Sequence, residues 1–363
     1  MTLSFYIARR FLGLFAQVFG AFAGVMLTID IIDQLRRFSD PGISVRDAAI
    51  LSAMNVPSSL YRILPLILVL SAIGLFIGLA RSSELVVVRA AGRSGLRFLV
   101  APVMTAFGIG MFAVAVMNPM VAATSREYDT RAQGLARGGS VLSISEDGLW
   151  LRQGGATGQT VIQAARANLD GTELYDATFL TFDAKGTPLG RIEAQTARLG
   201  GGSWTLTGVK LWPLNALNPE QGATVLDTAE VSTDLTPDKI RDGFGTPSAI
   251  GIWDLPSYIA GLERAGFSAV SYRVWFQMEL ALPLLFASMV LVAAGFTMRH
   301  SRLGKTGTWV MLALMGGFLI FFLRNFGQVL GDNGQIPVVL AAWTPPIAAG
   351  LFALGLLLHL EDG

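Results

Sequence analysis

Residues Leu280–Met298 read LALPLLFASMVLVAAGFTM, an unbroken run that contains no Asp, Glu, Lys or Arg. A helix needs about 20 apolar residues to cross the hydrocarbon core of a bilayer. A soluble helix of similar length normally keeps charged residues on its outer face. The run therefore predicts a transmembrane helix, and the rest of the chain contains further runs of the same kind.

Five more stretches are free of charge and long enough to span a bilayer. They are Phe11–Ile29, Ile63–Ala80, Phe98–Met117, Thr306–Leu323 and Gln335–Leu358. The 363-residue chain is 52% hydrophobic and only 15% charged, which is more apolar than a soluble domain requires. We predict an α-helical membrane protein with six transmembrane helices.

The spacing of these stretches divides the chain into three parts. Residues 1–117 carry the first three helices, residues 118–277 form an insert, and residues 278–363 carry the last three. We interpret the first stretch as a retained helix and not as a signal peptide, because its apolar run continues past Ala21-Phe22-Ala23 to Ile32.

The insert has the pattern of an all-β domain. Short segments rich in β-branched and aromatic residues are separated by turn residues such as Asp170-Gly171 and Gly200-Gly201-Gly202. The segments are Val141–Ser145, Gly148–Gln153, Thr160–Ala164, Ala177–Asp183, Arg191–Leu199, Ser203–Trp212 and Thr224–Ser232. We predict a jelly-roll-like or sandwich domain with inward-facing Trp204, Leu206 and Leu211, followed by a helix over Asp254–Glu263.

The orientation follows from the basic residues of the short loops, because Lys and Arg accumulate on the cytoplasmic side. With both termini cytoplasmic, the inner segments hold Arg9, Arg10, Arg81, Arg89, Arg93, Arg97, Arg299, Arg302 and Lys305. The outer short segments hold only Arg36, Arg37, Arg46, Arg62 and Arg324. This arrangement predicts that the insert is extracytoplasmic, and periplasmic in a Gram-negative bacterium.

Motifs for catalysis and cofactor binding are weak. Gly304-Lys305-Thr306 matches the end of a phosphate-binding loop, but Arg299 occupies the place of the required first glycine. With two histidines and no cysteine, a zinc site of the usual nitrogen and sulfur type is not expected. We expect no metal site, no cofactor bound by this chain and no enzyme activity, so that energy for transport comes from another subunit or a gradient.

The loop between the second and third helices, Arg81–Gly92, reads RSSELVVVRAAG. It predicts a short helix closed by Gly92, with Glu84 and Val88 one turn apart. One interpretation is an interfacial helix whose arginines face lipid headgroups. The other is a coupling helix that docks on a cytosolic ATPase, and the residues alone do not separate the two.

Two basic positions lie near the outer ends of predicted helices. Arg36 and Arg37 follow the first helix, where they form either a solvated helix end or a pair of cations for lipid phosphates. Arg324 follows the fifth apolar stretch, where it either extends to the interface or contacts substrate.

The segments Arg81–Gly92, Asp33–Arg37 and Trp253–Pro256, together with the division into three helices, an insert and three helices, resemble the LptF/LptG permease family. The resemblance covers essentially the whole chain, and the Arg81–Gly92 segment is its most specific part. Asp30 stands where a lysine can lie in this family, about a turn before the basic pair.

The resemblance implies an ATP-driven exporter that extracts lipopolysaccharide from the outer leaflet of the inner membrane. LptF and LptG pair as a heterodimer with two copies of the ATPase LptB, which carries the ATP and Mg, and the lipid passes to LptC and then LptA. It also implies roles for particular residues. They are ATPase coupling by Glu84, Leu85, Val88 and Arg89, phosphate binding by Arg36, Arg37 and Arg324, and a lipid gate formed by Phe22, Met26, Phe318 and Phe322.

Other functions stay in view. The chain could instead be the LptF-type member of this family, or a related permease that exports another lipid. A secondary transporter would carry ionisable residues near the centre of the membrane, and the six apolar stretches contain none. A periplasmic sensor would need a cytoplasmic output domain, yet the longest predicted inner loop is Arg81–Arg97. No feature indicates nucleic-acid binding.

Overall fold

The structure is a computed structural model. It describes residues 2–38, 44–82, 84, 95–135, 141–145, 148–155, 158–168, 171–183, 186–214, 218–233, 235–236, 240, 246–264, 268–298 and 306–362. The chain forms two compact units. The helix unit contains residues 1–131, 248–253 and 270–363, and the insert unit contains residues 132–247 and 254–269.

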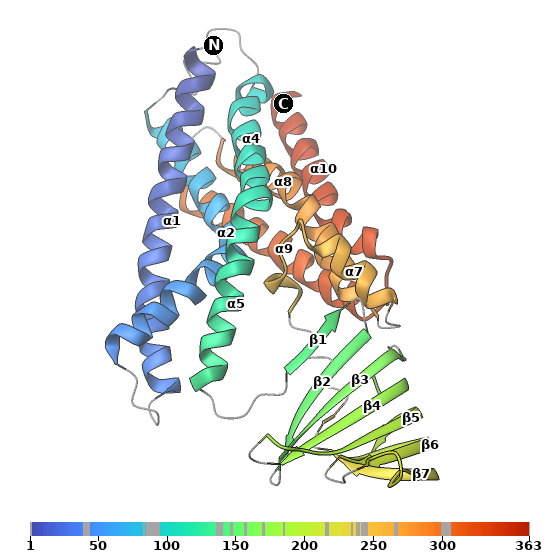
Figure 1. The fold of residues 1–363 in the computed structure, drawn as a ribbon. Coiled ribbons are helices and arrows are strands. Elements are labelled where there is room, and N and C mark those ends of the chain that lie inside the picture. Colours follow the sequence, from blue (N-terminus) through green and yellow to red (C-terminus); the bar gives the residue numbers. More distant parts are fainter. Residues whose placement is uncertain are drawn as a thin grey trace. The chain divides into compact units, whose positions relative to one another are not determined.

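The described part of the helix unit contains six helical spans that are long and apolar enough to cross a membrane, as predicted. Their helices are α1 (Thr2–Arg37), α2 (Val45–Arg81), α4 (Gly95–Phe112) continued by the π-helix η1 (Ala113–Met117) and α5 (Asn118–Leu135), α8 (Val270–Thr297), α9 (Thr306–Asp332) and α10 (Val338–Asp362). The start of α1 and the end of α10 lie at the same end of this unit (Figure 1).

Several helices extend well beyond the charge-free stretches that predict them. The third span continues as α5 to Leu135, and α8 begins at Val270, ten residues before the apolar run that opens at Leu280. Polar residues can continue a helix outside the hydrocarbon core because its backbone hydrogen bonds are internal. The predicted insert boundaries, 117/118 and 277/278, therefore fall within continuous helical segments.

The start of α2 has a complete capping box, in which the Ser44 hydroxyl accepts from the Asp47 amide and the Asp47 carboxylate accepts from the Ser44 amide. These reciprocal bonds satisfy amides that a helix end leaves unpaired. They fix the start of α2 at Val45, directly after Ser44.

Among the six spans, α8 is the most enclosed: 78% of the residues in its most apolar segment are buried. It packs against α2, α4, α9 and α10. Its approach to α4 depends on Gly110, because a Cβ there would lie 2.5 Å from the Pro283 Cα. By contrast, no residue in the most apolar segment of α1 is buried. Much of the surface of this helix is therefore available to lipid or to a partner.

The insert unit contains a seven-stranded antiparallel sheet, with strands in the order β1 to β7. The strands are β1 (Val141–Ser145), β2 (Gly148–Gly155), β3 (Gly158–Ala167), β4 (Glu173–Asp183), β5 (Pro188–Gly200), β6 (Ser203–Pro213) and β7 (Thr224–Ser232). They lie side by side as one curved layer (Figure 1). Gly201 and Gly202, both with positive φ, form the tight turn between β5 and β6.

One face of this sheet forms the core of the insert. Trp204 and Leu206 are fully buried, and Phe179 meets Trp204 edge to face at 6.3 Å between ring centroids. Leu211 is only half-buried. After β7 come the short 3-10 helix η2 (Pro247–Ala249), at the boundary between the two units, and the helix α7 (Leu255–Arg264) of the insert unit.

The fold class predicted from the sequence is confirmed: the described residues form six membrane-length helices, and an all-β region is inserted along the chain between the third and the fourth. All seven predicted strand segments and the helix after Asp254 are present. The described strands follow a simpler path than the predicted jelly roll, because each pairs with the next strand along the chain in a single sheet. Alternation of apolar residues indicates strands, but it does not indicate their order.

Candidate functional site

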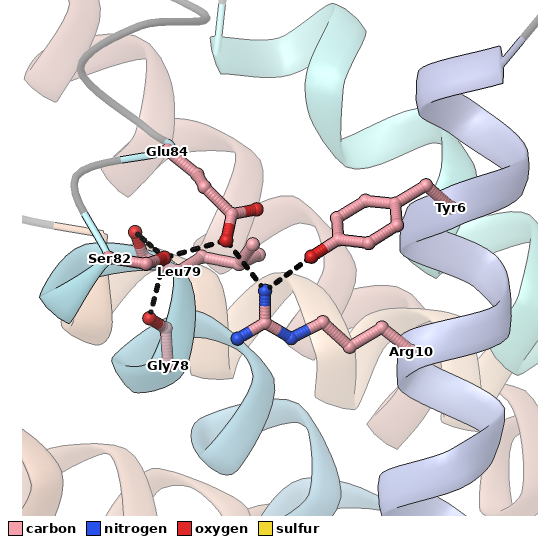
Figure 2. A network of polar contacts seen from close by, with 6 residues as sticks. All are labelled: Tyr6, Arg10, Gly78, Leu79, Ser82 and Glu84. Carbon is pink, nitrogen blue, oxygen red and sulfur yellow. Dashed lines mark hydrogen bonds and ion pairs between the residues drawn. The ribbon is translucent and has the colours of Figure 1, made fainter.

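The first polar cluster lies where α2 ends, and we call it the loop cluster: Tyr6, Arg10, Ser82 and Glu84 (Figure 2). Arg10 Nη1 donates to Glu84 Oε1 at 2.8 Å and to the Tyr6 hydroxyl at 2.9 Å. The Ser82 hydroxyl donates to the same Glu84 oxygen at 2.7 Å. Glu84 is thus held between the first turns of α1 and the end of α2.

The loop cluster is half-exposed, since the side chains of Arg10 and Glu84 keep 30% and 32% of their surface accessible. Burial alone would raise the pKa of Glu84. The hydrogen bond from Ser82, followed by the hydrogen bond and charge of Arg10, outweighs burial and leaves this pKa below its ordinary value of 4.5. Glu84 is therefore an ionised acid at neutral pH that water or a partner can reach.

The other residues predicted to couple to an ATPase are Leu85, Val88 and Arg89, and they lie outside the described residues. Sequence reasoning identified Glu84, but it did not identify Arg10 as its partner. The two residues are 74 positions apart, and no local spacing relates them.

A second group of polar contacts lies at the other end of α1. Gln34 Nε2 donates to the Tyr128 hydroxyl at 3.0 Å, and Arg37 Nη1 donates to the same oxygen at 3.3 Å. Gln34 is buried, whereas Arg36 and Arg37 are exposed. The predicted basic pair is therefore accessible, and Tyr128 of α5 holds one member of it.

Asp30 takes part in this region as a brace between helices. Its Oδ1 accepts from Asn55 Nδ2 of α2 at 2.7 Å, and its Oδ2 accepts from Gln34 Nε2 at 3.4 Å. An acid at this position thus joins α1 to α2, which a lysine could not do through the same acceptor contacts.

The predicted gate residues have two different environments. Phe22 and Met26 of α1 are partly buried against a cluster on α2 formed by Val56, Leu60 and Ile67. Phe318 and Phe322 of α9 are 58% and 63% exposed, and Phe322 stacks on Phe326. The face of α9 therefore presents large apolar side chains, as a surface facing lipid or another membrane helix does.

The third group, the buried cluster, consists of Tyr61, Asn118, Glu279 and Arg324. The Tyr61 hydroxyl donates to Glu279 Oε2, and Asn118 Nδ2 donates to the same oxygen at 3.1 Å. Glu279 is completely buried, and Arg324 is 9% exposed. The charge of the buried Arg324 favours the ionised form of Glu279 and burial opposes it, while Glu279 Oε1 accepts no hydrogen bond from the part of the chain that the structure describes.

The buried cluster corrects the expectation that the spans hold no ionisable group. Glu279 directly precedes the apolar stretch Leu280–Met298, and Asn118 directly follows Phe98–Met117. The charge-free stretches leave both residues outside the membrane helices, yet both lie within continuous helical spans and are buried. Arg324, predicted from the sequence to contact lipid phosphate, lies in this cluster, and that role stays a prediction.

Six membrane-length helices with an exposed apolar face place this chain among the multi-pass membrane proteins. The model of the family described as lipopolysaccharide export system permease LptF/LptG matches residues 5–359, and the chain belongs to this family. It is accordingly a multi-pass inner-membrane permease, as the resemblance predicts.

Curated relatives agree with this assignment. The chain is 26% identical to the lipopolysaccharide export system permease protein LptG of Haemophilus influenzae over 353 residues, which cover 95% of both chains. It is 28% identical to the protein of the same name from Escherichia coli over 341 residues, which cover 91% of both chains.

Proposed function

We propose that this chain is the LptG-type permease subunit of an ATP-driven exporter that extracts lipopolysaccharide from the outer leaflet of the inner membrane. In this proposal it pairs with LptF and two copies of the ATPase LptB, and it passes the lipid through LptC to LptA. The observation that carries the proposal is the family match over nearly the whole chain, joined to relatives that are named LptG.

The proposed orientation has both termini in the cytoplasm and the insert in the periplasm. The excess of Lys and Arg in the predicted inner loops supports it. The position of the α1 start and the α10 end at the same end of the helix unit also supports it (Figure 1). The loop cluster then lies on the cytoplasmic side, where an ATPase can reach Glu84.

Glu84 is proposed to carry the coupling to LptB, together with Leu85, Val88 and Arg89. An accessible carboxylate held by Arg10 and Ser82 can exchange one of these donors for a donor on a docking partner. The chain itself is proposed to bind no cofactor, and ATP and Mg act on the ATPase.

The lipid is proposed to enter beside α1 and α9. Phe22, Met26, Phe318 and Phe322 would contact acyl chains, because an amphiphile with several chains needs an apolar surface between helices. Arg36 and Arg37, and in this proposal Arg324, would bind the phosphates through charge-assisted hydrogen bonds. Exposure of the basic pair and of the α9 phenylalanines supports this path.

The test is co-purification of the tagged chain with LptF and LptB, followed by ATP-dependent release of lipopolysaccharide from proteoliposomes. Wild type should recover both partners and release lipid. Glu84→Ala should lose LptB or lose ATP-driven release. Failure of wild type to recover either partner, under conditions that keep other membrane complexes intact, would rule out the proposed assembly.

Arg10→Ala is the matched control, because it breaks the same ion pair and leaves the acid in place. If Glu84 itself docks, Arg10→Ala keeps LptB. If both variants lose LptB equally, Glu84 acts by bracing α1 against the loop, and the docking role is wrong.

A further inference from the structure

A short piece of the insert's connecting chain belongs to the helix unit. Residues 248–253, which we call the docking segment, pack with the helices, although the chain before and after them belongs to the insert unit. Hydrogen bonds fix it to the third span, and those among the described residues include the following three. Arg126 Nε donates to the Ala249 carbonyl at 2.9 Å, the Ile252 amide to Asn118 Oδ1 at 2.8 Å, and Trp253 Nε1 to the Ala115 carbonyl at 3.2 Å.

One of these acceptors, the Ala115 carbonyl, lies in a turn that departs from α-helical geometry. Ala115 lies in the π-helix Ala113–Met117, and the Asn118 amide donates back to the Ala113 carbonyl, five residues earlier. A wider turn of this kind changes which carbonyls are taken up within the helix, and short π-helical turns often mark functional sites. Here the turn presents a carbonyl to Trp253 and is followed at once by Asn118.

Asn118 connects the docking segment to the buried cluster. Its Oδ1 accepts from Ile252, and its Nδ2 donates to Glu279 Oε2, so both ends of one carboxamide are used. The Asn118 and Ile252 residues are 2% and 3% exposed, which leaves water little access to compete for these bonds. The carboxamide is therefore held in one orientation by partners on both sides.

Glu279 in turn connects Asn118 to two more helices. Its Oε2 accepts from Tyr61 of α2, and its charge attracts Arg324 of α9. The hydrogen bonds join α2, α8 and the third span to a segment that is covalently continuous with the insert on both sides. Polar groups buried this deeply are satisfied in few arrangements, so a shift of α2 or α8 must move Asn118 or break its bonds.

We propose that Asn118 is a positioning residue that transmits movement of the membrane helices to the β insert through the docking segment, with Glu279 orienting its side chain. This inference rests on the proposed lipid export, in which the helix unit releases a lipid and the insert receives it. Asn118 contacts no lipid in this scheme. It couples transfer of the lipid to the insert with the movement of α2 and α8.

The experiment uses the full complex with LptF and LptB in proteoliposomes, and it measures ATP hydrolysis and lipopolysaccharide release together. Asn118→Leu should keep ATP hydrolysis and lower the lipid released per ATP. Loss of one hydrogen bond of the strength found between membrane helices should raise the population of molecules in which the docking segment is detached from Asn118 by about threefold to thirtyfold. A purely structural defect would lower hydrolysis, release and recovered complex together.

A second readout follows the segment itself. The chain has no cysteine, so Ile250→Cys and Ala123→Cys provide a clean pair of labelling sites on the docking segment and on α5. Ile250 is half-buried and Ala123 is exposed, so a label can be attached at both positions. The spin–spin distance distribution should be narrow in the parent and broad with Asn118→Leu. Unchanged distances together with unchanged lipid per ATP would overturn the inference.

Trp253→Phe is a second variant that should fold normally. Trp253 is 70% exposed, and the substitution removes only its hydrogen bond to the Ala115 carbonyl. Its matched control is Trp343→Phe, which removes an equivalent indole bond to Gln277 between α10 and α8. Trp253→Phe should reduce lipid per ATP, and Trp343→Phe should not. Equal effects would overturn the inference, whereas lack of release by wild type would instead defeat the proposed function.

Discussion

The loop cluster and the buried cluster use the same side-chain chemistry at different depths. Each holds a glutamate that accepts from two donors, with a tyrosine and an arginine nearby. In the loop cluster, Glu84 and Arg10 keep about a third of their surface exposed. In the buried cluster, Glu279 has none.

This difference in depth determines what each acid can do. An exposed ion pair contributes little to stability and exchanges partners readily, because water replaces a lost partner. A buried charge without its partner is costly, because nothing else in the interior compensates it. Glu84 is therefore suited to reversible docking, and Glu279 to holding helices in a fixed relation.

The strongest test of this contrast is removal of the buried acid. Glu279→Leu removes the acceptor of the Tyr61 and Asn118 donors, and it removes the negative charge that acts on the buried Arg324. The expected loss is about 3–5 kcal/mol in the free energy of unfolding. Thermal unfolding of the detergent-solubilised protein measures it.

The double variant Glu279→Leu/Arg324→Leu provides the control for charge. It removes both members of the pair, so it should be more stable than Glu279→Leu alone. A double variant whose loss equals the sum of the two single losses would show that the charges do not offset each other.

A smaller effect is expected when only one donor of the buried cluster is removed. Tyr61→Phe keeps the ring and deletes the hydroxyl that donates to Glu279, while Asn118 still donates to the same oxygen. We expect a loss of about 1–2 kcal/mol, read from the same unfolding curves. A loss as large as that of Glu279→Leu would mean that Asn118 provides no support to the carboxylate.

The sequence predicted the elements of the fold better than their ends. Alternating residues and tight turns identified all seven strands, because both signals are local. The charge-free stretches predicted all six membrane-length helices that the described residues contain, but several of these stretches end inside a longer helix. Glu279 and Asn118 lie at such ends, and their burial depends on neighbouring helices that no local pattern records.

The roles of the candidate site residues stay predictions. The sequence pointed to Glu84 through the loop motif Arg81–Gly92, and to Arg36 and Arg37 through their position at the end of the first helix. Their partners do not stand out: Arg10 reaches Glu84 across 74 positions, and Tyr128 meets Arg37 across 91. The π-helix before Asn118 was also missed, since one widened turn leaves the apolar pattern of the span intact.

In the loop cluster, Arg10→Ala should change the free energy of unfolding by less than about 1 kcal/mol, because the pair it breaks is accessible to water. The matched comparison is Arg324→Ala, which removes the corresponding arginine from the buried cluster. Unfolding midpoints of the two variants, measured side by side, should differ clearly. Equal midpoints would contradict the assignment of different roles by depth.

The smallest expected effect is the pH dependence of the loop cluster. Because the folded pKa of Glu84 is lowered from 4.5, its ionised form is favoured by folding, and the stability it adds is fully present above that value. This contribution is lost as the pH falls through the lower folded pKa. The difference in unfolding midpoint between wild type and Glu84→Gln should therefore be constant from neutral pH down to about 5 and shrink in stronger acid. Ser82→Ala removes a donor to Glu84, so the pH at which this stability is lost should be higher in that background. A difference between wild type and Glu84→Gln that grows in acid would show that Arg10 and Ser82 do not favour the carboxylate.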